Sequence, residues 1–212
     1  MAEHHEDPVG HRAPDAEAAV LDAKGLRVLA HPVRVQLVGL LRKFGPSTAT
    51  QLAQRLNVNT GSASYHLRQL GAVGLVEEDR ERGNARERWW RAAHRVTRFD
   101  DPELVESEPE AALAYMRSVA RVYTLRCQQA LDEAPAMPPA WQNTLDMSDR
   151  ALRLTVDEAH ALREELQAVL GRYRADHPET PAPEDAERVS VIVQVLPELD
   201  VPPVPSEGRS GE

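Results

Sequence analysis

The fold is decided by residues 47–72, which read Ser47-Thr-Ala-Thr-Gln-Leu-Ala-Gln-Arg-Leu-Asn-Val-Asn-Thr-Gly-Ser-Ala-Ser-Tyr-His-Leu-Arg-Gln-Leu-Gly-Ala72. Thr48, with Gln51 three residues later, is typical of a helix N-terminus. Two apolar stripes at helical spacing follow it, namely Leu52-Ala53-Leu56 and Ala63-Leu67-Leu70. Because polar residues separate the two stripes, the stretch predicts a helix, a tight turn and a second helix over residues 60–72.

The flanking residues extend this pattern in both directions. Upstream, apolar residues at helical spacing predict a short helix and then a helix that starts at Pro32 and ends at Gly45. Downstream, residues 75–76 and 88–90 predict two strands joined by a polar link with turn residues. A helix-turn-helix followed by a basic hairpin is the layout of a winged helix-turn-helix domain, which we expect over residues 21–100.

The helix over residues 60–72 carries short polar side chains on its outward side, as a helix that enters a DNA major groove about 12 Å wide requires. The hairpin adds cations at its tip. The candidate DNA-contacting residues are Asn59, Thr60, Ser62, Ser64, Tyr65, His66 and Arg68 of the turn and helix, and Arg80, Arg82, Asn84 and Arg86 of the hairpin. Two have a second interpretation, because His66 can pack or form a hydrogen bond inside the domain and Tyr65 can belong to the core.

Charge is distributed unevenly along the chain. The 212 residues carry a net charge of −9, which taken alone argues against a polyanionic partner. Residues 21–100, however, hold 14 Lys and Arg against 7 Asp and Glu, a balance of +7, whereas the remainder carries −16. The predicted DNA-binding part is therefore locally basic, and the acidic remainder would repel DNA from other faces.

Several motifs between residues 25 and 95 resemble, in order and spacing, those of the bacterial ArsR-type winged-helix regulators, in particular the non-metal-sensing branch seen in actinobacteria. They are Leu26-Arg-Val-Leu-Ala-His-Pro-Val-Arg34, Leu52-Ala53, Ser64-Tyr-His-Leu-Arg68, Leu70, Gly74-Leu-Val76 and Arg86-Glu-Arg-Trp89. The later segment Leu152-x-Leu-Thr-x-x-Glu158 is similar to the C-terminal extension of that branch. The resemblance implies a homodimer that binds an inverted repeat in double-stranded DNA through two recognition helices, usually as a repressor. It also implies contacts to bases or phosphates from Thr60, Ser62, Ser64, Tyr65 and Arg68, and wing contacts from Arg82, Asn84 and Arg86.

The sequence departs from the metal-sensing members of that family. Where those members carry a thiolate pair, this chain reads Ala49-Thr-Gln-Leu-Ala-Gln-Arg-Leu56, and residues 110–131 contain no His. We therefore expect no metal and no other cofactor. His4, His5 and His11 could hold a metal but read more simply as an incidental cluster. The identity of any small-molecule effector stays open.

Residues 103–196 are expected to form a helical dimerisation region with a small sheet. Ser107-x-x-Glu110 reads as a capping box before a long helix that ends near Pro135, and Thr155-x-x-Glu158 caps a further helix. The long helix carries an apolar seam with heptad-like spacing, which we assign to the dimer interface: Leu113, Met116, Ala120, Tyr123, Cys127 and Ala130. Alternating apolar residues predict three short strands, at residues 145–147, 152–154 and 189–195. The seam has a second interpretation, as part of the core within one chain. Cys127 has two interpretations, either a small buried apolar residue or a redox-sensitive thiol.

The composition and the lack of known motifs argue against a secreted protein, a membrane-spanning protein and an enzyme. A single cysteine excludes an intrachain disulfide and fits a reducing cytoplasm, no apolar run is long enough to span a bilayer, and the acidic N-terminus predicts no signal peptide. We therefore expect a cytoplasmic, nucleoid-associated protein with no membrane partner. The sequence contains no GxSxG, phosphate loop, HExxH or credible Cys–His pair, so an enzyme is not expected. The acidic segment 1–20 and the Pro-rich segment 197–212 predict disordered ends.

The sequence as a whole predicts a mainly α fold with small β elements, in a homodimeric DNA-binding regulator. Two alternatives of another kind stay open. One is a protein-interaction module that uses the winged helix and the acidic C-terminal region. The other is a regulator that responds to a small molecule held in a pocket of residues 103–196.

Overall fold

The structure is a computed structural model that describes residues 18–83, 87–99, 101–174, 176 and 181–198. The first seventeen residues, which include His4, His5 and His11, and the residues from 199 onward lie outside this part of the chain. The disorder expected for both ends, and the metal site considered for the three histidines, are therefore not described by the structure.

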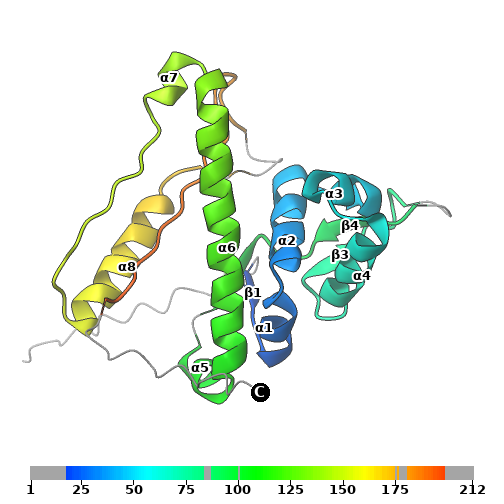
Figure 1. Cartoon of the computed structure of the whole chain (residues 1–212), viewed down its shortest axis with the longest axis horizontal. Coiled ribbons are helices and arrows are strands. Elements are labelled where there is room, and N and C mark those ends of the chain that lie inside the picture. The colour runs from blue at the N-terminus through cyan, green and yellow to red at the C-terminus, as the bar shows by residue number, and fades with distance from the viewer. Residues whose placement is uncertain (1–17, 84–86, 100, 175, 177–180, 199–212) are drawn as a thin grey trace, which may run out of the picture. The chain divides into compact units, whose positions relative to one another are not determined.

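The first of two compact units, Met1–Thr144, is mainly helical. Its helices are, in chain order, α1 (Ala23–Leu29), α2 (Pro32–Phe44), α3 (Ala49–Leu56), α4 (Thr60–Gly71), α5 (Pro102–Ser107), α6 (Pro109–Glu133), the 3-10 helix η1 (Ala134–Ala136) and α7 (Pro139–Gln142) (Figure 1). Its strands are β1 (Ala18–Val20), β2 (Ser47–Thr48), β3 (Val76–Glu78), β4 (Trp89–Ala92) and β5 (Val96–Arg98). The predicted mainly α fold with small β elements is confirmed. None of the helices in the described residues is both long and apolar enough to cross a bilayer.

Local capping sets the ends of α2, α3 and α4. Pro32 occupies the first position of α2, and Gly45 ends this helix with a φ of 73°, a conformation that glycine adopts without strain. Thr48 and Gln51 form both hydrogen bonds of the capping box that the sequence predicts for α3. Asn57 ends α3 in the left-handed region, at a φ of 53°, which asparagine tolerates better than most residues. The predicted tight turn between α3 and α4 is therefore confirmed.

The strands form two small sheets. β4 lies between β2 and β3 and pairs antiparallel with both, with Thr48 opposite Trp89 in the β2–β4 pair. β3 and β4 are the hairpin expected after the helix-turn-helix. β1 pairs in parallel with β5, and Ala18 lies opposite Val96. The last residues of the expected disordered arm therefore form a strand, which the local sequence could not predict because β1 depends on a partner far along the chain.

The core of the first unit consists mostly of aliphatic side chains from α1 to α4 and β3. Those that are fully buried are Leu26, Leu37, Leu41, Leu52, Leu67, Leu70 and Val76. Trp90 of β4 is also buried and Trp89 is half-buried, because successive residues of a strand face opposite sides. With aromatic residues at only 4% of the chain, leucine supplies most of the buried apolar surface.

The start of α6 differs from the sequence prediction. Ser107 is the last residue of α5, and its hydroxyl donates a 3.5 Å hydrogen bond to the backbone oxygen of Leu104. α6 begins at Pro109 and has no side-chain cap. The predicted capping box of Ser107 and Glu110 is therefore wrong, because proline fits the first position of a helix and places the break between the two helices just before it.

The long helix α6 packs on α1 and α2 within the first unit (Figure 1). Its buried residues are Ala112, Ser118 and Val122. The hydroxyl of Ser118 donates a 2.7 Å hydrogen bond to the backbone oxygen of Ala30, at the end of α1. The boundary between compact units therefore does not fall near Pro102, where the sequence pattern changes, and α6 belongs with the helix-turn-helix.

The second compact unit, Leu145–Glu212, contains α8 (Val156–Leu170). Thr155 and Glu158 form both hydrogen bonds of the predicted capping box. The described residues of this unit contain no strand, so the predicted strands at 145–147, 152–154 and 189–195, and the small sheet expected there, are wrong. Their apolar side chains are largely exposed, and an alternating pattern forms a strand only where another strand pairs with its backbone.

Candidate nucleic-acid interface

The helix α4 has one buried face and one outward face. The buried residues are Ala63, His66, Leu67 and Leu70. Thr60, Gly61, Tyr65 and Arg68 are exposed, and Ser62 and Ser64 are half-buried beside them. Tyr65 is 49% exposed, so its interpretation as a core residue does not hold. The outward face therefore combines hydroxyl groups with one guanidinium, all of which can form hydrogen bonds with base edges or phosphates.

The N-terminus of α4 is capped by Asn59. Its Oδ1 accepts a 2.7 Å hydrogen bond from the backbone N–H of Ser62. Asn59 is predicted to contact DNA. Because its side-chain oxygen is engaged in this hydrogen bond, its side-chain amide nitrogen is the group that can donate a hydrogen bond outward. The positive end of the helix also favours an approaching phosphate.

His66 lies on the buried side of α4. Its Nδ1 accepts a 3.2 Å hydrogen bond from Nε of Arg34, and its ring centroid lies 4.5 Å from that of His31. Arg34 also donates a 3.0 Å hydrogen bond to the backbone oxygen of Val28. Of the two interpretations of His66, packing and hydrogen bonding inside the domain therefore agree with the structure. The side chain is largely buried, and its contact with DNA remains a prediction.

The surroundings of His66 favour its neutral form. Burial, followed by the effects of His31 and Arg34, lowers the pKa of His66, and burial and Arg34 lower the pKa of His31. Nδ1 of His31 accepts a 3.3 Å hydrogen bond from the backbone N–H of Val33, as the N-cap of α2. A ring nitrogen accepts a hydrogen bond only when it carries no proton, so these two bonds agree with the lowered pKa of each ring in favouring neutral imidazoles. α4 is thus joined to the start of α2 through uncharged rings and one guanidinium.

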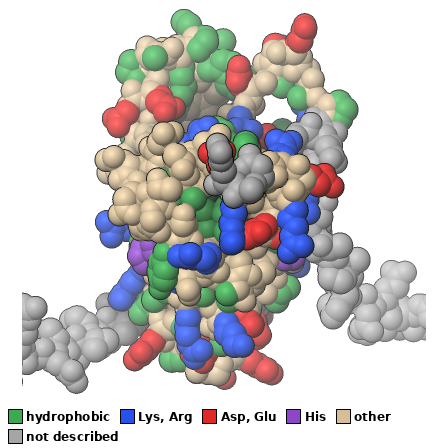
Figure 2. All heavy atoms as spheres, turned by 90° about the vertical axis from the view of Figure 1, so that its right-hand side faces the viewer, with side chains coloured by type: hydrophobic (Ala, Val, Ile, Leu, Met, Phe, Trp, Pro, Cys, Tyr) green, Lys and Arg blue, Asp and Glu red, His purple; other side chains and the backbone are tan. Residues whose placement is uncertain are grey.

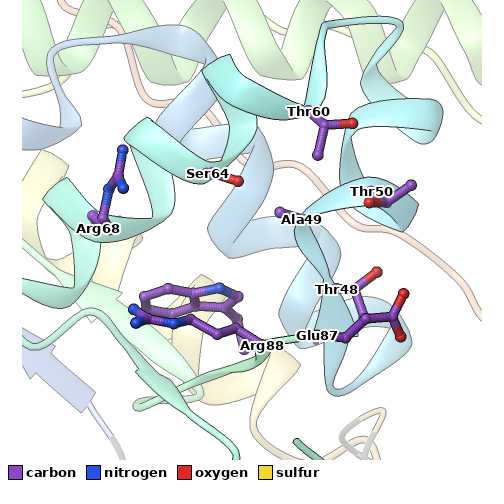
Figure 3. Close-up of a pocket in the computed structure, with 9 residues that line it drawn as sticks. Thr48, Ala49, Thr50, Thr60, Ser64, Arg68, Glu87 and Arg88 are labelled. Carbon is purple, nitrogen blue, oxygen red and sulfur yellow. The ribbon is translucent and has the colours of Figure 1, made fainter. Parts of the chain in front are cut away.

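A pocket of about 440 Å³ lies beside the outward face of α4 (Figure 3). Its lining residues are Thr48, Ala49, Thr50, Thr60, Ser64, Arg68, Glu87, Arg88 and Trp90. Thr60, Ser64 and Arg68 come from α4, Thr50 from the start of α3, and Arg88 from the residue before β4 (Figure 3). Hydroxyl groups and two guanidiniums suit a polar anionic occupant such as a stretch of sugar–phosphate backbone, and Glu87 adds one carboxylate to the same lining.

Cross-strand ion pairs join β3 and β4. Nη1 of Arg88 lies 2.8 Å from Oε1 of Glu78, and Nη2 of Arg91 lies 3.0 Å from Oε1 of Glu77. The acidic side chains of β3 are therefore offset by arginines of the same hairpin. In the described part of the turn, Asp79 and Glu81 likewise accompany Arg80 and Arg82.

The turn of the hairpin carries the predicted wing residues, of which the structure describes two. Arg80 and Arg82 are exposed, and Nε of Arg82 lies 3.6 Å from Oδ2 of Asp79. Asn84 and Arg86 lie outside the described residues. The wing contacts expected at these two positions therefore remain predictions.

Basic side chains gather on the face formed by α3, α4 and the hairpin. Figure 2 shows Lys and Arg side chains across the middle of this face and most of the Asp and Glu side chains nearer its edges. The exposed arginines of α4 and the described part of the hairpin are Arg68, Arg80, Arg82, Arg88 and Arg91. The hairpin also exposes Glu77, Glu78, Glu81 and Glu87, so only part of the positive balance of residues 21–100 lies on this face.

Six residues of the pocket were not among the sequence candidates, namely Thr48, Ala49, Thr50, Glu87, Arg88 and Trp90. Thr50 could have been found, because the first helix of a helix-turn-helix crosses the DNA backbone and its first turn lies close to phosphates. Arg88 and Trp90 depend on the pairing of β3 with β4, which places Glu78 opposite Trp90. No local sequence signal gives that register.

The apolar seam predicted for α6 is mostly exposed. Leu113, Met116, Ala120 and Ala130 are exposed, and Tyr123 and Cys127 are half-buried. The face of α6 that packs within the chain is a neighbouring one, so the exposed members of the seam do not belong to the core of the first unit. Within the described residues, no three His, Cys, Asp or Glu side chains form a group that could hold a metal ion.

The succession of α2, α3, a tight turn, α4 and the β3–β4 hairpin is that of a winged helix-turn-helix. Residues 29–79 match the family described as a helix-turn-helix domain. The first unit therefore contains a helix-turn-helix domain, as the sequence predicts.

Three known proteins show what the chain is similar to. It is 38% identical over 66 residues to the HTH-type transcriptional regulator NmtR of Mycobacterium tuberculosis, a match that covers 31% of this chain and 54% of NmtR. The chain thus spans about half the length of this curated relative. A mutant of Lactococcus lactis ZitR in its apo form matches with a TM-score of 0.27 and 14% identity, over 68% of this chain and 84% of that chain. The transcriptional regulator Tm0710 from Thermotoga maritima matches with a TM-score of 0.28 and 12% identity, over 69% and 87%.

Proposed function

We propose that this protein is a sequence-specific DNA-binding transcription regulator, in which α4 enters the major groove and the β3–β4 hairpin contacts the backbone or the minor groove. The observation that carries the proposal is the outward face of α4, where Ser62, Ser64, Tyr65 and Arg68 lie beside the exposed arginines of the hairpin. Small side chains at the start of the helix allow close approach to the bases, and the arginine can bond two acceptors of one guanine.

We further propose a homodimer that binds an inverted repeat and acts as a repressor. A single recognition helix contacts few base pairs, whereas two helices related by a twofold axis read two half-sites. The exposed apolar residues of α6, such as Leu113 at 44% and Met116 at 45% exposure, support a dimer through this helix. The repressor role rests on the resemblance to ArsR-type regulators.

DNA binding is tested by fluorescence anisotropy with DNA from upstream of the gene of this protein and with a random sequence of the same length. We expect the upstream DNA to bind at least about a thousand times more tightly, and log K to fall linearly with log salt. Equal affinity for the two DNAs at matched salt would overturn sequence specificity. Absence of binding at micromolar protein would favour a protein-interaction module instead.

Single substitutions separate base contacts from phosphate contacts. Arg68→Ala and Ser62→Ala should reduce the discrimination between the two DNAs, by about 1–3 kcal/mol if the lost contact is bidentate. Arg82→Ala should weaken both DNAs alike and reduce the slope of log K against log salt by about 1. Arg163→Ala, on α8 of the second unit, is the matched control and should change neither quantity.

The dimer is tested by sedimentation equilibrium of the wild type and of Met116→Glu. We expect a wild-type dimer and a variant that dissociates, because a carboxylate would be placed in an apolar interface. A wild-type monomer at micromolar concentration would overturn the proposed dimer.

A response to a small molecule is the second candidate function. The observation that favours it is a cluster of two arginines and two tyrosines where α2 meets α6, formed by Arg42, Tyr115, Tyr123 and Arg126.

A further inference from the structure

Arg42 is a partly buried arginine on the side of α2 that faces α6. Its Nε donates a 2.9 Å hydrogen bond to the backbone oxygen of His94, and its Nη2 donates a 2.8 Å hydrogen bond to Oγ1 of Thr97. Both acceptors are neutral, so these bonds hold the guanidinium in place without balancing its charge. They also join α2 to the segment that follows β4 and leads into β5.

Arg126 of α6 brings a second guanidinium to the same place. Its Nη2 lies 2.7 Å from the position that a Cβ on Gly39 would occupy, and Gly39 is one helical turn before Arg42 on α2. The guanidinium carbon of Arg126 lies 6.0 Å from the ring centroid of Tyr123. The absence of a side chain at Gly39 therefore leaves room for the Arg126 guanidinium at its present position on α2.

The charges of this arginine–tyrosine cluster, made of Arg42, Tyr115, Tyr123 and Arg126, are not balanced within the described residues. No carboxylate there pairs with either arginine or affects the ionisation of Arg42. Burial above all lowers the pKa of Arg42, and Arg126 lowers it further, whereas burial raises the pKa of Tyr115. Arg42 is partly buried and Arg126 is exposed, so water screens the repulsion between their like charges only in part, and an anion between or beside them would relieve it.

We propose that the arginine–tyrosine cluster is a binding site for a small free anion that carries a carboxylate or phosphate group. A guanidinium presents a planar fork of donors that matches either group, and the two phenol groups add O–H donors. The site lies between two helices of one compact unit and Arg42 is only partly accessible, which favours a small anion over a protein segment.

Occupation of this site would affect the parts of the protein that the proposed function uses. Arg42 holds the segment after the hairpin strand β4, and Arg126 lies on the helix that carries the exposed apolar residues. An anion that draws the two guanidiniums together would change how α6 lies on α2 and hence the spacing of the two recognition helices of a dimer. Such an effect on DNA affinity rests on the proposed function, whereas the binding of the anion does not.

Binding is tested by thermal unfolding of the full chain with sodium citrate or sodium phosphate, against sodium chloride at equal ionic strength. We expect citrate or phosphate at millimolar concentration to raise the Tm of the wild type by at least about 2 °C above the chloride control. Arg126→Gln should lose this rise, with an affinity for the anion at least about tenfold weaker by calorimetric titration. Tyr123→Phe, which keeps the ring, should weaken binding less.

Arg117→Gln is the matched control, since Arg117 is an exposed arginine on the same helix and outside the cluster. It should respond to the anions as the wild type does. An equal response to chloride, citrate and phosphate, or an unchanged response of Arg126→Gln, would overturn the site. If the anions bind but leave the affinity for upstream DNA the same as in chloride, the site stands and its effect on DNA binding is refuted. The thermal measurements hold even if the protein binds no DNA.

Discussion

Asn59 offers a test that separates helix capping from DNA contact. Its Oδ1 accepts a 2.7 Å hydrogen bond from the backbone N–H of Ser62 at the start of α4. Asn59→Ala removes this acceptor, and the loss of an N-cap of this kind costs about 1 kcal/mol, within a range of about 0.5–2 kcal/mol. We expect the Tm of the first unit to fall by about 2–6 °C as a result.

Asn59→Asp is the matched variant. Aspartate keeps an oxygen that can accept the same hydrogen bond, and its charge is favourable at the positive end of a helix, so the Tm should equal or exceed that of the wild type. The same negative charge would face the phosphates of bound DNA. DNA affinity should therefore fall, and it should fall more at low salt, where charges are less screened.

Asn59→Ala should therefore lower the Tm, whereas Asn59→Asp should keep the Tm and lower the DNA affinity. Thermal unfolding followed by circular dichroism gives the first quantity, and fluorescence anisotropy at about 50 mM and 200 mM salt gives the second. Thr155→Ala, which removes the corresponding cap from α8, controls for the loss of a cap in the second unit and should leave DNA affinity unchanged. A wild-type Tm for Asn59→Ala would refute the capping role. Unchanged affinity of Asn59→Asp at low salt would place this end of α4 away from DNA.

The remaining predictions concern the stability of the first unit, measured by urea denaturation. Because the folded pKa of His66 lies below the value of 6.5 expected for an unfolded chain, the unfolded state takes up a proton more readily. The free energy of unfolding should therefore decrease as the pH falls from about 6.5 to the folded pKa and not change further below it; a pH profile that is the same in His66→Gln would contradict this. Leu67→Ala should cost about 2–5 kcal/mol, since Leu67 is fully buried. Ser118→Ala should cost about 1 kcal/mol because it removes the 2.7 Å hydrogen bond to α1, whereas Thr124→Ala, whose hydroxyl bonds only to its own helix, should change stability by less than about 0.5 kcal/mol.

The helix-turn-helix was predictable because its signals are local. Thr48 and Gln51 cap α3 through residues three apart, Pro32 sets the start of α2, and the burial of Leu67 and Leu70 follows the helical period. Such features depend on a few neighbouring residues, so the sequence alone can indicate them. The outward residues of α4 could be assigned for the same reason, since the helical period that buries one side exposes the other.

The errors concern features that depend on distant residues. β1 forms only because β5 is present to pair with it, and the alternating residues near Leu152 and Val191 do not form strands because the described chain offers no partner strand. His66 lies at a position that the helical period leaves ambiguous, at the margin of the buried stripe. Arg34, 32 residues earlier, resolves that ambiguity by donating a hydrogen bond to it.

The pairing of β1 with β5 has a consequence for how the first unit folds. Ala18 lies opposite Val96, so this contact closes a loop of about 80 residues, while α1 to α4 are joined by much shorter connections. Contacts between distant residues form late, and during synthesis β5 leaves the ribosome only after the helix-turn-helix is complete. Until then, Ala19 and Leu21, both buried in the final structure, lack the strand that lies beside them. We therefore expect the helix-turn-helix to fold first and the N-terminal strand to join it only once the hairpin has been made.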